Sequence, residues 1–193
     1  MSADGDGQPM LDQRVGALAE AVAARTPAPG AGAVTGLAAV LAAALAAMVA
    51  RFSAADAAAA ECDRLRRRLE PLGDEDAAAY EAYLAAIRLP RDDVHRSTRV
   101  VDTLSAATDV PMHLVELAAE VAAHAARLAR DGNPRLRGDA VAAALLAAAA
   151  ARTAAVLVAV NLDGQEAFRA DPRPGRARVR AAEAQTLADG VAG

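Results

Sequence analysis

The feature that most limits the fold is a stretch of twenty residues, Ala31 to Ala50, that carries no charged side chain. A helix that is apolar on every face must be surrounded by protein or lipid, because no face suits water. The stretch follows a turn rich in proline and glycine, and glycine lets the backbone of a turn take conformations that other residues avoid. These residues predict a buried core helix with other helices packed around it.

The same stretch has the length of a membrane span, since about twenty apolar residues cross a bilayer. Most of it is alanine, however, and alanine gives only a slight drive for insertion. Residues 1–9 contain acids and no basic segment of the kind that begins a signal peptide. We therefore expect a cytoplasmic protein with no membrane partner.

The composition favours helices along the whole chain. Hydrophobic residues make up 54% of it and aromatic residues only 2%. Alanine supplies much of the apolar total, and it is the strongest helix former while filling little volume. No run of strand length alternates between apolar and polar residues. We predict an all-α fold, an antiparallel helical bundle with two buried Ala-rich core helices, the second spanning Ala140 to Leu162.

The length fits one domain, expected over residues 9–190, and residues 1–8 are expected to form a disordered tail. Helical periodicity and stop signals place the helices at about 10–24, 31–52, 54–69, 74–89, 94–108, 111–130, 140–162 and 176–188. In this scheme Pro111 opens a new helix, because proline is favoured at the first helical position.

Charge and lysine content exclude some functions. The net charge is −4, which argues against a nucleic-acid partner, because phosphate binding is driven by basic surfaces. All 21 basic residues are arginine, so mechanisms that use a lysine Schiff base are excluded.

The metal-binding and thiol residues are few. The single Cys62 excludes an internal disulfide and a multi-cysteine metal site, and we expect it to be inert. His95, His113 and His124 are scattered, and the last two lie about 16 Å apart along a helix, too far to share a metal ion. We expect no metal site.

Two aspartates stand out near predicted helix starts. Asp76 and Tyr80 are four residues apart and share a helix face. Asp139 begins the second apolar helix, and Asn133 lies in the turn before it. Two interpretations stay open for the aspartates. Each can cap a helix, or burial can raise the pKa of its carboxyl and suit it to acid–base catalysis.

Several short motifs, each weak by itself, occur in a consistent order. They are Pro27-Ala-Pro-Gly-Ala-Gly32, Met48-Val-Ala50, Asp76-Ala-Ala-Ala-Tyr80, Ala86-Ile-Arg-Leu-Pro90, Val110-Pro-Met112, Gly132-Asn133, Gly138-Asp139 and Leu157-Val-Ala-Val-Asn-Leu162. Over about residues 11–165 this pattern resembles the cyclodeaminase/cyclohydrolase family. That family includes the C-terminal domain of formiminotransferase-cyclodeaminase and stand-alone methenyltetrahydrofolate cyclohydrolases.

The resemblance implies an all-helical, usually homodimeric enzyme that acts on tetrahydrofolate derivatives without a metal or another cofactor. Such enzymes either expel ammonia from a formimino group to close the methenyl ring or add water to that ring. By resemblance, Asp76 and Asp139 are the catalytic acid–base candidates. The ligand-binding candidates are Pro29, Gly30, Ala31, Gly32, Tyr80, His113, Asn133, Leu157 and Asn161.

The chain departs from the family pattern at Ala31, where the family has glycine, and at Leu157, where it has asparagine. Both changes make the expected site less polar or narrower. A second hypothesis is therefore that the chain opens or closes the ring of a non-folate cyclic imine or iminium. A third is a non-catalytic helical module, with Arg64 to Arg68, otherwise a solvated face, as its binding surface.

Overall fold

The computed structural model describes residues 8–193, and within them every regular element is a helix, which confirms the all-α fold. The α-helices are α1 (Val15–Ala23), α2 (Ala31–Phe52), α3 (Asp56–Leu69), α4 (Leu72–Ile87), α5 (Arg96–Asp131), α6 (Arg137–Leu162) and α7 (Arg173–Ala192). Short 3-10 turns are η1 (Met10–Asp12), η2 (Pro134–Leu136) and η3 (Glu166–Phe168). The tail expected at residues 1–8 lies outside the described residues, except for Gln8.

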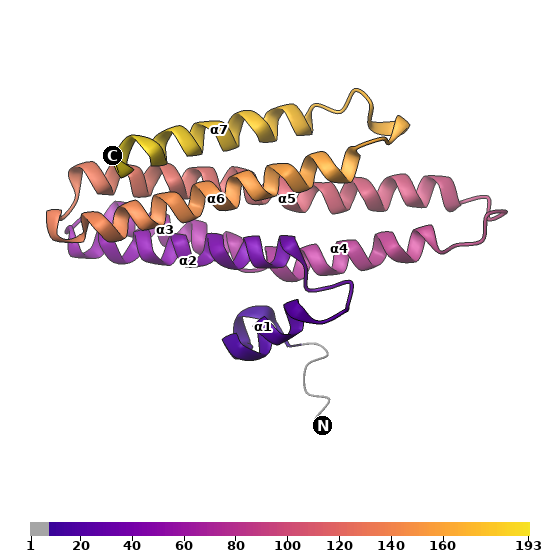
Figure 1. Cartoon of the computed structure of the whole chain (residues 1–193), viewed down its shortest axis with the longest axis horizontal. Helices are drawn as coiled ribbons and strands as arrows, with labels where there is room; N and C mark the ends of the chain where they lie inside the picture. The colour runs from indigo at the N-terminus through magenta and orange to yellow at the C-terminus, as the bar shows by residue number, and fades with distance from the viewer. Residues whose placement is uncertain (1–7) are drawn as a thin grey trace.

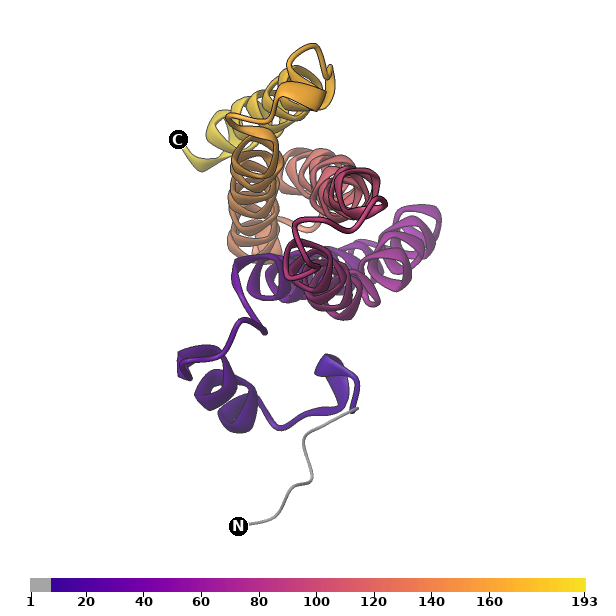
Figure 2. The same cartoon turned by 90° about the vertical axis from the view of Figure 1, so that its right-hand side faces the viewer.

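The bundle is organised along α5, whose 36 residues give it a length of about 54 Å. Helices α6 and α7 run back and forth beside it, while the α2–α3 hairpin and α4 pack against its two halves (Figure 1). Viewed end-on, α7 lies on the opposite side of the α5–α6 pair from α2 and α4, and α1 stands away from the bundle (Figure 2). Arg137, the first residue of α6, donates a hydrogen bond of 2.8 Å to the backbone carbonyl of Val191 near the end of α7. This bond links the open end of the α6–α7 hairpin.

Small side chains form most of the core. Along α6 the fully buried residues include Ala140, Ala143, Ala144, Ala147, Ala148, Ala151 and Ala154, which recur at the three- and four-residue spacing of one helix face. Few large side chains, such as Leu65 and Leu114, are fully buried. Because alanine adds little width to a helix, these helices approach closely along long stretches of contact. The expected Ala-rich core helices are therefore α2 and α6.

The two core helices are buried on one side only. On α2, Val34 and Leu41 are 46% and 56% exposed, and on α6, Val156 and Val160 are 59% and 64% exposed. Both α2 and the segment 134–162 are long and apolar enough to cross a membrane. In the bundle, 61% of the most apolar part of α2 is buried, and 44% of the most apolar part of segment 134–162 is buried. Within one chain, α2 is not surrounded by other helices as its sequence predicts.

The helix break predicted at Pro111 does not occur, and that prediction was wrong. Pro111 lies inside α5, which continues from Arg96 to Asp131. A proline inside a helix removes one backbone hydrogen bond and disfavours the helix locally. Here Leu104 before it and Leu114 after it are both buried in the core, so tertiary packing holds the two halves in line. The first predicted helix also differs, because residues 10–14 form a 3-10 turn and an extended link before α1.

Close packing of alanine predicts that an enlarged core side chain destabilises the bundle. We expect Ala147→Leu, at a fully buried position, to lower the free energy of unfolding by about 1–3 kcal/mol. Ala60→Leu, at an exposed position on α3, is the control and should change it by less than about 0.5 kcal/mol. Urea denaturation followed by circular dichroism measures both, and equal effects would contradict the close-packed interface.

Candidate functional site

A small cavity of about 160 Å³ lies where α2 begins, beside the first turns of α4, the middle of α5 and the end of α6. Its lining is apolar except for a few side chains. The lining residues are Pro27, Ala28, Gly30, Ala31, Gly32, Asp76, Ala77, Tyr80, Ala107, Leu157 and Asn161. Seven of these were predicted as site residues from the sequence.

The carboxylate of Asp76 lies directly against the first turn of α2. A Cβ atom added at Gly32 would be 2.2 Å from the carboxyl carbon and from both oxygens of Asp76. Only a glycine at position 32 leaves room for the carboxylate there. The first turn of a helix has free N–H groups and the positive end of the helix dipole, so it is a favourable place for a carboxylate.

Burial raises the pKa of the Asp76 carboxyl above its ordinary value, because the charged form is removed from water. Asp76 is the one charged residue among the lining residues of this cavity. Its position excludes one of the two interpretations of Asp76. It lies in the second turn of α4, and the N-cap of that helix, Pro71, makes no side-chain capping bond. Asp76 is therefore not a helix cap.

Asn161 contributes the second polar side chain of the cavity. Its Nδ2 donates a hydrogen bond of 3.1 Å to the backbone carbonyl of Ala107 on α5. Because a carbonyl only accepts, the amide nitrogen faces α5, and the amide oxygen is the acceptor left for a ligand.

Helical spacing brings the remaining lining side chains together as predicted. Tyr80 follows Asp76 by one turn of α4, and Leu157 precedes Asn161 by one turn of α6. Tyr80 is 41% exposed, so it forms the rim of the cavity and not its floor. Leu157 and Ala31 give the cavity two apolar walls.

Four other predicted site residues lie elsewhere. Asn133 lies at the far end of α2, where its Nδ2 donates to the Phe52 carbonyl over 3.2 Å. Asp139 is in the first turn of α6, about 27 Å along that helix from Leu157. His113 is exposed on α5 and does not line the cavity.

The fourth of these, Pro29, lines a larger neighbouring hollow of about 750 Å³ between the N-terminal segment and α4. Both hollows are lined by Ala28 and Ala77, so they adjoin. Asp74, on the wall of the larger hollow, accepts a hydrogen bond from the Met10 backbone N–H at 3.1 Å and anchors the N-terminal segment there.

Sequence reasoning missed four lining residues, Pro27, Ala28, Ala77 and Ala107. The first three belong to the motifs Pro27–Gly32 and Asp76–Tyr80, which also contain predicted residues. Ala107 is distant in sequence from every motif residue that lines the cavity. The one sequence feature near it is Pro111, four residues later.

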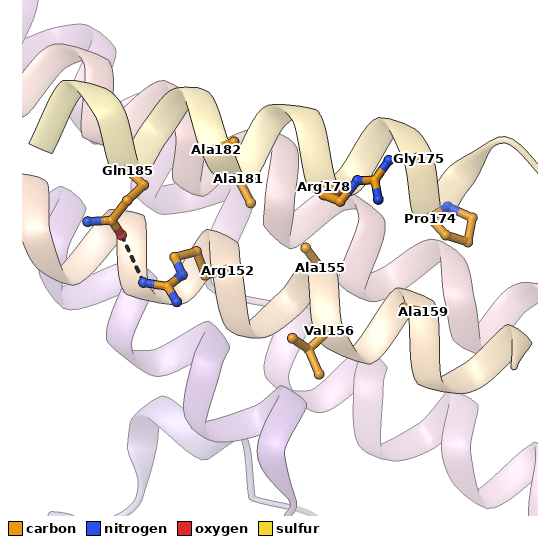
Figure 3. A pocket seen from close by; sticks show the side chains of 10 residues that line it. All are labelled: Arg152, Ala155, Val156, Ala159, Pro174, Gly175, Arg178, Ala181, Ala182 and Gln185. Carbon is orange, nitrogen blue, oxygen red and sulfur yellow. Dashed lines mark hydrogen bonds between the residues drawn. The ribbon is translucent and has the colours of Figure 1, made fainter.

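A second groove, between α6 and α7, holds no comparable chemistry. It has a volume of about 600 Å³ and is lined mostly by small side chains (Figure 3). Its polar members are Arg152, Arg178 and Gln185, and Arg152 donates to Gln185 over 3.3 Å. In the part of the chain that the structure describes, no three metal-ligating side chains gather at one place.

Comparison with known proteins links the chain to enzymes of folate chemistry. The chain is 35% identical over 104 residues to a methenyltetrahydrofolate cyclohydrolase from Methylorubrum extorquens, which covers 52% of the chain and 50% of that protein. It is 32% identical over 186 residues to a formimidoyltransferase-cyclodeaminase from Sus scrofa, which covers 88% of the chain and 34% of that protein. The chain thus matches half or less of the length of these relatives.

The fold has a close counterpart among solved structures. The crystal structure of a formiminotetrahydrofolate cyclodeaminase from Thermotoga maritima superposes with a TM-score of 0.80 over 95% of this chain and 99% of that one, at 24% identity. That similarity shows the shared fold. The family model for formiminotransferase-cyclodeaminase matches residues 14–170, most of the chain. The chain is therefore a member of the formiminotransferase-cyclodeaminase family.

Proposed function

We propose that the chain hydrolyses the cyclic amidinium of a one-carbon-substituted tetrahydrofolate, the methenyl form, with Asp76 as its acid–base group. The observation that carries this proposal is that Asp76 is the one charged residue lining a small cavity. A half-buried carboxylate with no cation beside it favours a positively charged ligand, since an opposite charge nearby stabilises the ionised form. An amidinium is such a ligand.

The proposed reaction needs only proton transfers. Water adds to the amidinium carbon, and its oxygen forms a bond to that carbon while Asp76 accepts the proton that water loses. The bond from carbon to one ring nitrogen then breaks, and that nitrogen takes the electron pair and the proton held by Asp76. At the same time the hydroxyl oxygen forms the carbonyl double bond to the carbon and releases its proton to solvent. The product is an open formyl compound. Over the whole reaction one water molecule is consumed and the positive charge of the ring leaves as a proton.

The size of the cavity limits which part of the ligand it takes. A volume of about 160 Å³ is below the 300–1,000 Å³ typical of sites for whole small molecules. We infer that the cavity holds the reacting carbon and its neighbouring atoms. The rest of the ligand would extend into the adjoining hollow beside Pro29 and Ala28.

A second candidate is ring opening or closing of a non-folate cyclic iminium. Ala31 and Leu157 make two walls of the cavity apolar, and no arginine lines either this cavity or the adjoining hollow. The adjoining hollow instead carries Asp74 and Glu81 on its wall. The acidic tail of a folate would gain no partner from these residues. A smaller cation without an acidic tail fits this electrostatic pattern.

The proposal predicts catalysis that depends on an ionised Asp76. Purified protein should abolish the absorbance of the methenyl chromophore faster than buffer, and Asp76→Asn should slow this by about a hundredfold or more. Because burial raises the pKa of Asp76, the rate should fall as the pH drops through that raised pKa, which lies above the ordinary value of 3.8.

A discontinuous assay with product analysis, made on folded protein, separates hydrolysis from deamination, from a non-folate substrate and from a non-catalytic module. Release of ammonia from a formimino compound would assign deamination at the same carbon. Turnover of a non-folate cyclic iminium that requires Asp76, with none of the methenyl compound, would support the second candidate. If protein with a native circular dichroism spectrum turns over neither compound, the non-catalytic helical module is the hypothesis that remains.

The close approach of Asp76 to α2 predicts different outcomes at two neighbouring glycines. Gly32→Ala would place Cβ 2.2 Å from the carboxylate, so the Asp76 side chain must move, and we expect kcat to fall at least tenfold. Gly30→Ala is the matched control, because its Cβ would come no closer than 3.9 Å, to the Pro27 carbonyl oxygen. Equal kcat values for the two variants would contradict the placement of Asp76.

We also propose that two copies of the chain associate through the open side of α2 and α6. Every residue of α2 from 31 to 50 is uncharged, so its exposed stripe is entirely apolar. Neighbouring exposed residues on α6 add Leu146, Val156 and Val160. A largely apolar face on two packed helices, here interrupted on α6 by Thr153, is typical of a surface covered by another subunit.

This association predicts that one charge on the face separates the copies. Leu41→Glu should convert the assembly to monomers in analytical ultracentrifugation, because the charged side chain would be buried between subunits without a partner. Val179→Glu on α7 is the control, since Val179 is equally exposed at 55% but lies away from that face. A wild-type protein that sediments as a monomer at micromolar concentration would refute the association.

A further inference from the structure

A proline inside the longest helix leaves one backbone carbonyl without its helical partner. In α5 the carbonyl of Ala107 would accept a hydrogen bond from the backbone N–H of residue 111. That residue is Pro111, which has no N–H. Pro111 is fully buried, so water does not supply a donor through the proline side.

The missing bond is replaced from another helix. Asn161, near the end of α6, donates from Nδ2 to the Ala107 carbonyl over 3.1 Å. Ala107 and Asn161 both line the cavity that contains Asp76. The bond therefore connects a feature of the α5 backbone to a polar side chain of the candidate site.

Other carbonyls just before the proline also receive side-chain donors. Arg173 Nη1 donates to the Ser105 carbonyl over 3.0 Å, and Thr108 Oγ1 donates to the Leu104 carbonyl over 2.8 Å. Both of these carbonyls also have a helical partner, since residues 108 and 109 carry a backbone N–H, whereas the Ala107 carbonyl has none. The segment 104–108 is thus a place where the α5 backbone accepts bonds from side chains, including those of α6 and the start of α7.

We propose that Pro111 is a positioning residue of the site, acting through Ala107 and Asn161. By leaving the Ala107 carbonyl free, Pro111 fixes the Asn161 amide in one orientation, with Nδ2 on the carbonyl and Oδ1 available as an acceptor for an N–H group of the ligand. The role in ligand binding rests on the proposed function, whereas the fixed amide is a property of the unliganded protein.

The reason that proline matters is that it leaves the Ala107 carbonyl to a single donor. Any other residue at position 111 would add a backbone N–H, and the Ala107 carbonyl would then be shared between that N–H and the Asn161 amide. The Asn161 amide would then have a weaker anchor and could rotate, exchanging its donor and acceptor ends. The α5 helix itself would gain, since proline is the least favourable residue in a helix interior.

The test uses Pro111→Ala, for which stability and function should move in opposite directions. We expect a melting temperature equal to or above that of the wild type, with kcat/KM reduced about tenfold, the worth of one hydrogen bond of ordinary strength. A fall in both quantities would indicate that Pro111 serves only the packing of α5, and would overturn the proposal.

A double-mutant cycle isolates the coupling between the two residues. Asn161→Asp keeps the shape of the side chain but cannot donate to the carbonyl, so in that background Pro111→Ala should cause no further loss. Independent, multiplicative losses would contradict an action of Pro111 through Asn161.

A measurement without turnover separates this proposal from the proposed function. In wild-type protein the Asn161 Nδ2 proton that bonds to the Ala107 carbonyl should be protected from exchange with solvent in NMR spectra, and Pro111→Ala should reduce this protection. A protected wild-type signal together with no turnover would refute the proposed function while the anchoring stands. Rapid exchange of this proton in the wild type would refute the anchoring, whatever the fate of the variant.

Discussion

The contact between the Asp76 carboxylate and the first turn of α2 depends on how closely these helices can approach. The carboxylate occupies the space that a side chain at Gly32 would fill. A similar closeness occurs one turn later, where a Cβ at Gly36 would lie 3.4 Å from the Gly73 backbone nitrogen of α4. Alanine faces continue the close packing through α5 and α6. A core of larger side chains would separate these helices and open the cavity to bulk water.

Two electrostatic effects act in opposite directions on the ionised form of Asp76, and their balance suits the acid–base role proposed for it. Burial penalises the ionised carboxyl of Asp76 and raises its pKa. The N-terminus of α2 favours the negative charge, as would a cationic ligand. A carboxyl held between these influences is poised to exchange a proton, whereas a fully paired carboxylate would stay ionised.

Several elements of the site follow from local sequence, and others do not. The four-residue spacing of Asp76 and Tyr80 places both on the cavity because one helix turn brings them to the same side. Asn133 and Asp139 come in sequence just before and just inside α6, as Gly30 and Gly32 do for α2. Since α2 and α6 run antiparallel, the start of α2 lies beside the end of α6 and far from the start of α6. Motifs that look equivalent along the chain are therefore far apart in one subunit.

The sequence by itself determined the helical class, the two Ala-rich core helices and the family, because composition, periodicity and ordered motifs are local properties of the chain. Tertiary structure decided which motifs meet. It kept α5 continuous through Pro111, because buried residues on both sides and the Asn161 amide offset the lost hydrogen bond. It also exposed one stripe of α2 that the sequence predicts to be covered. Such outcomes depend on contacts between residues distant in sequence, which no local pattern specifies.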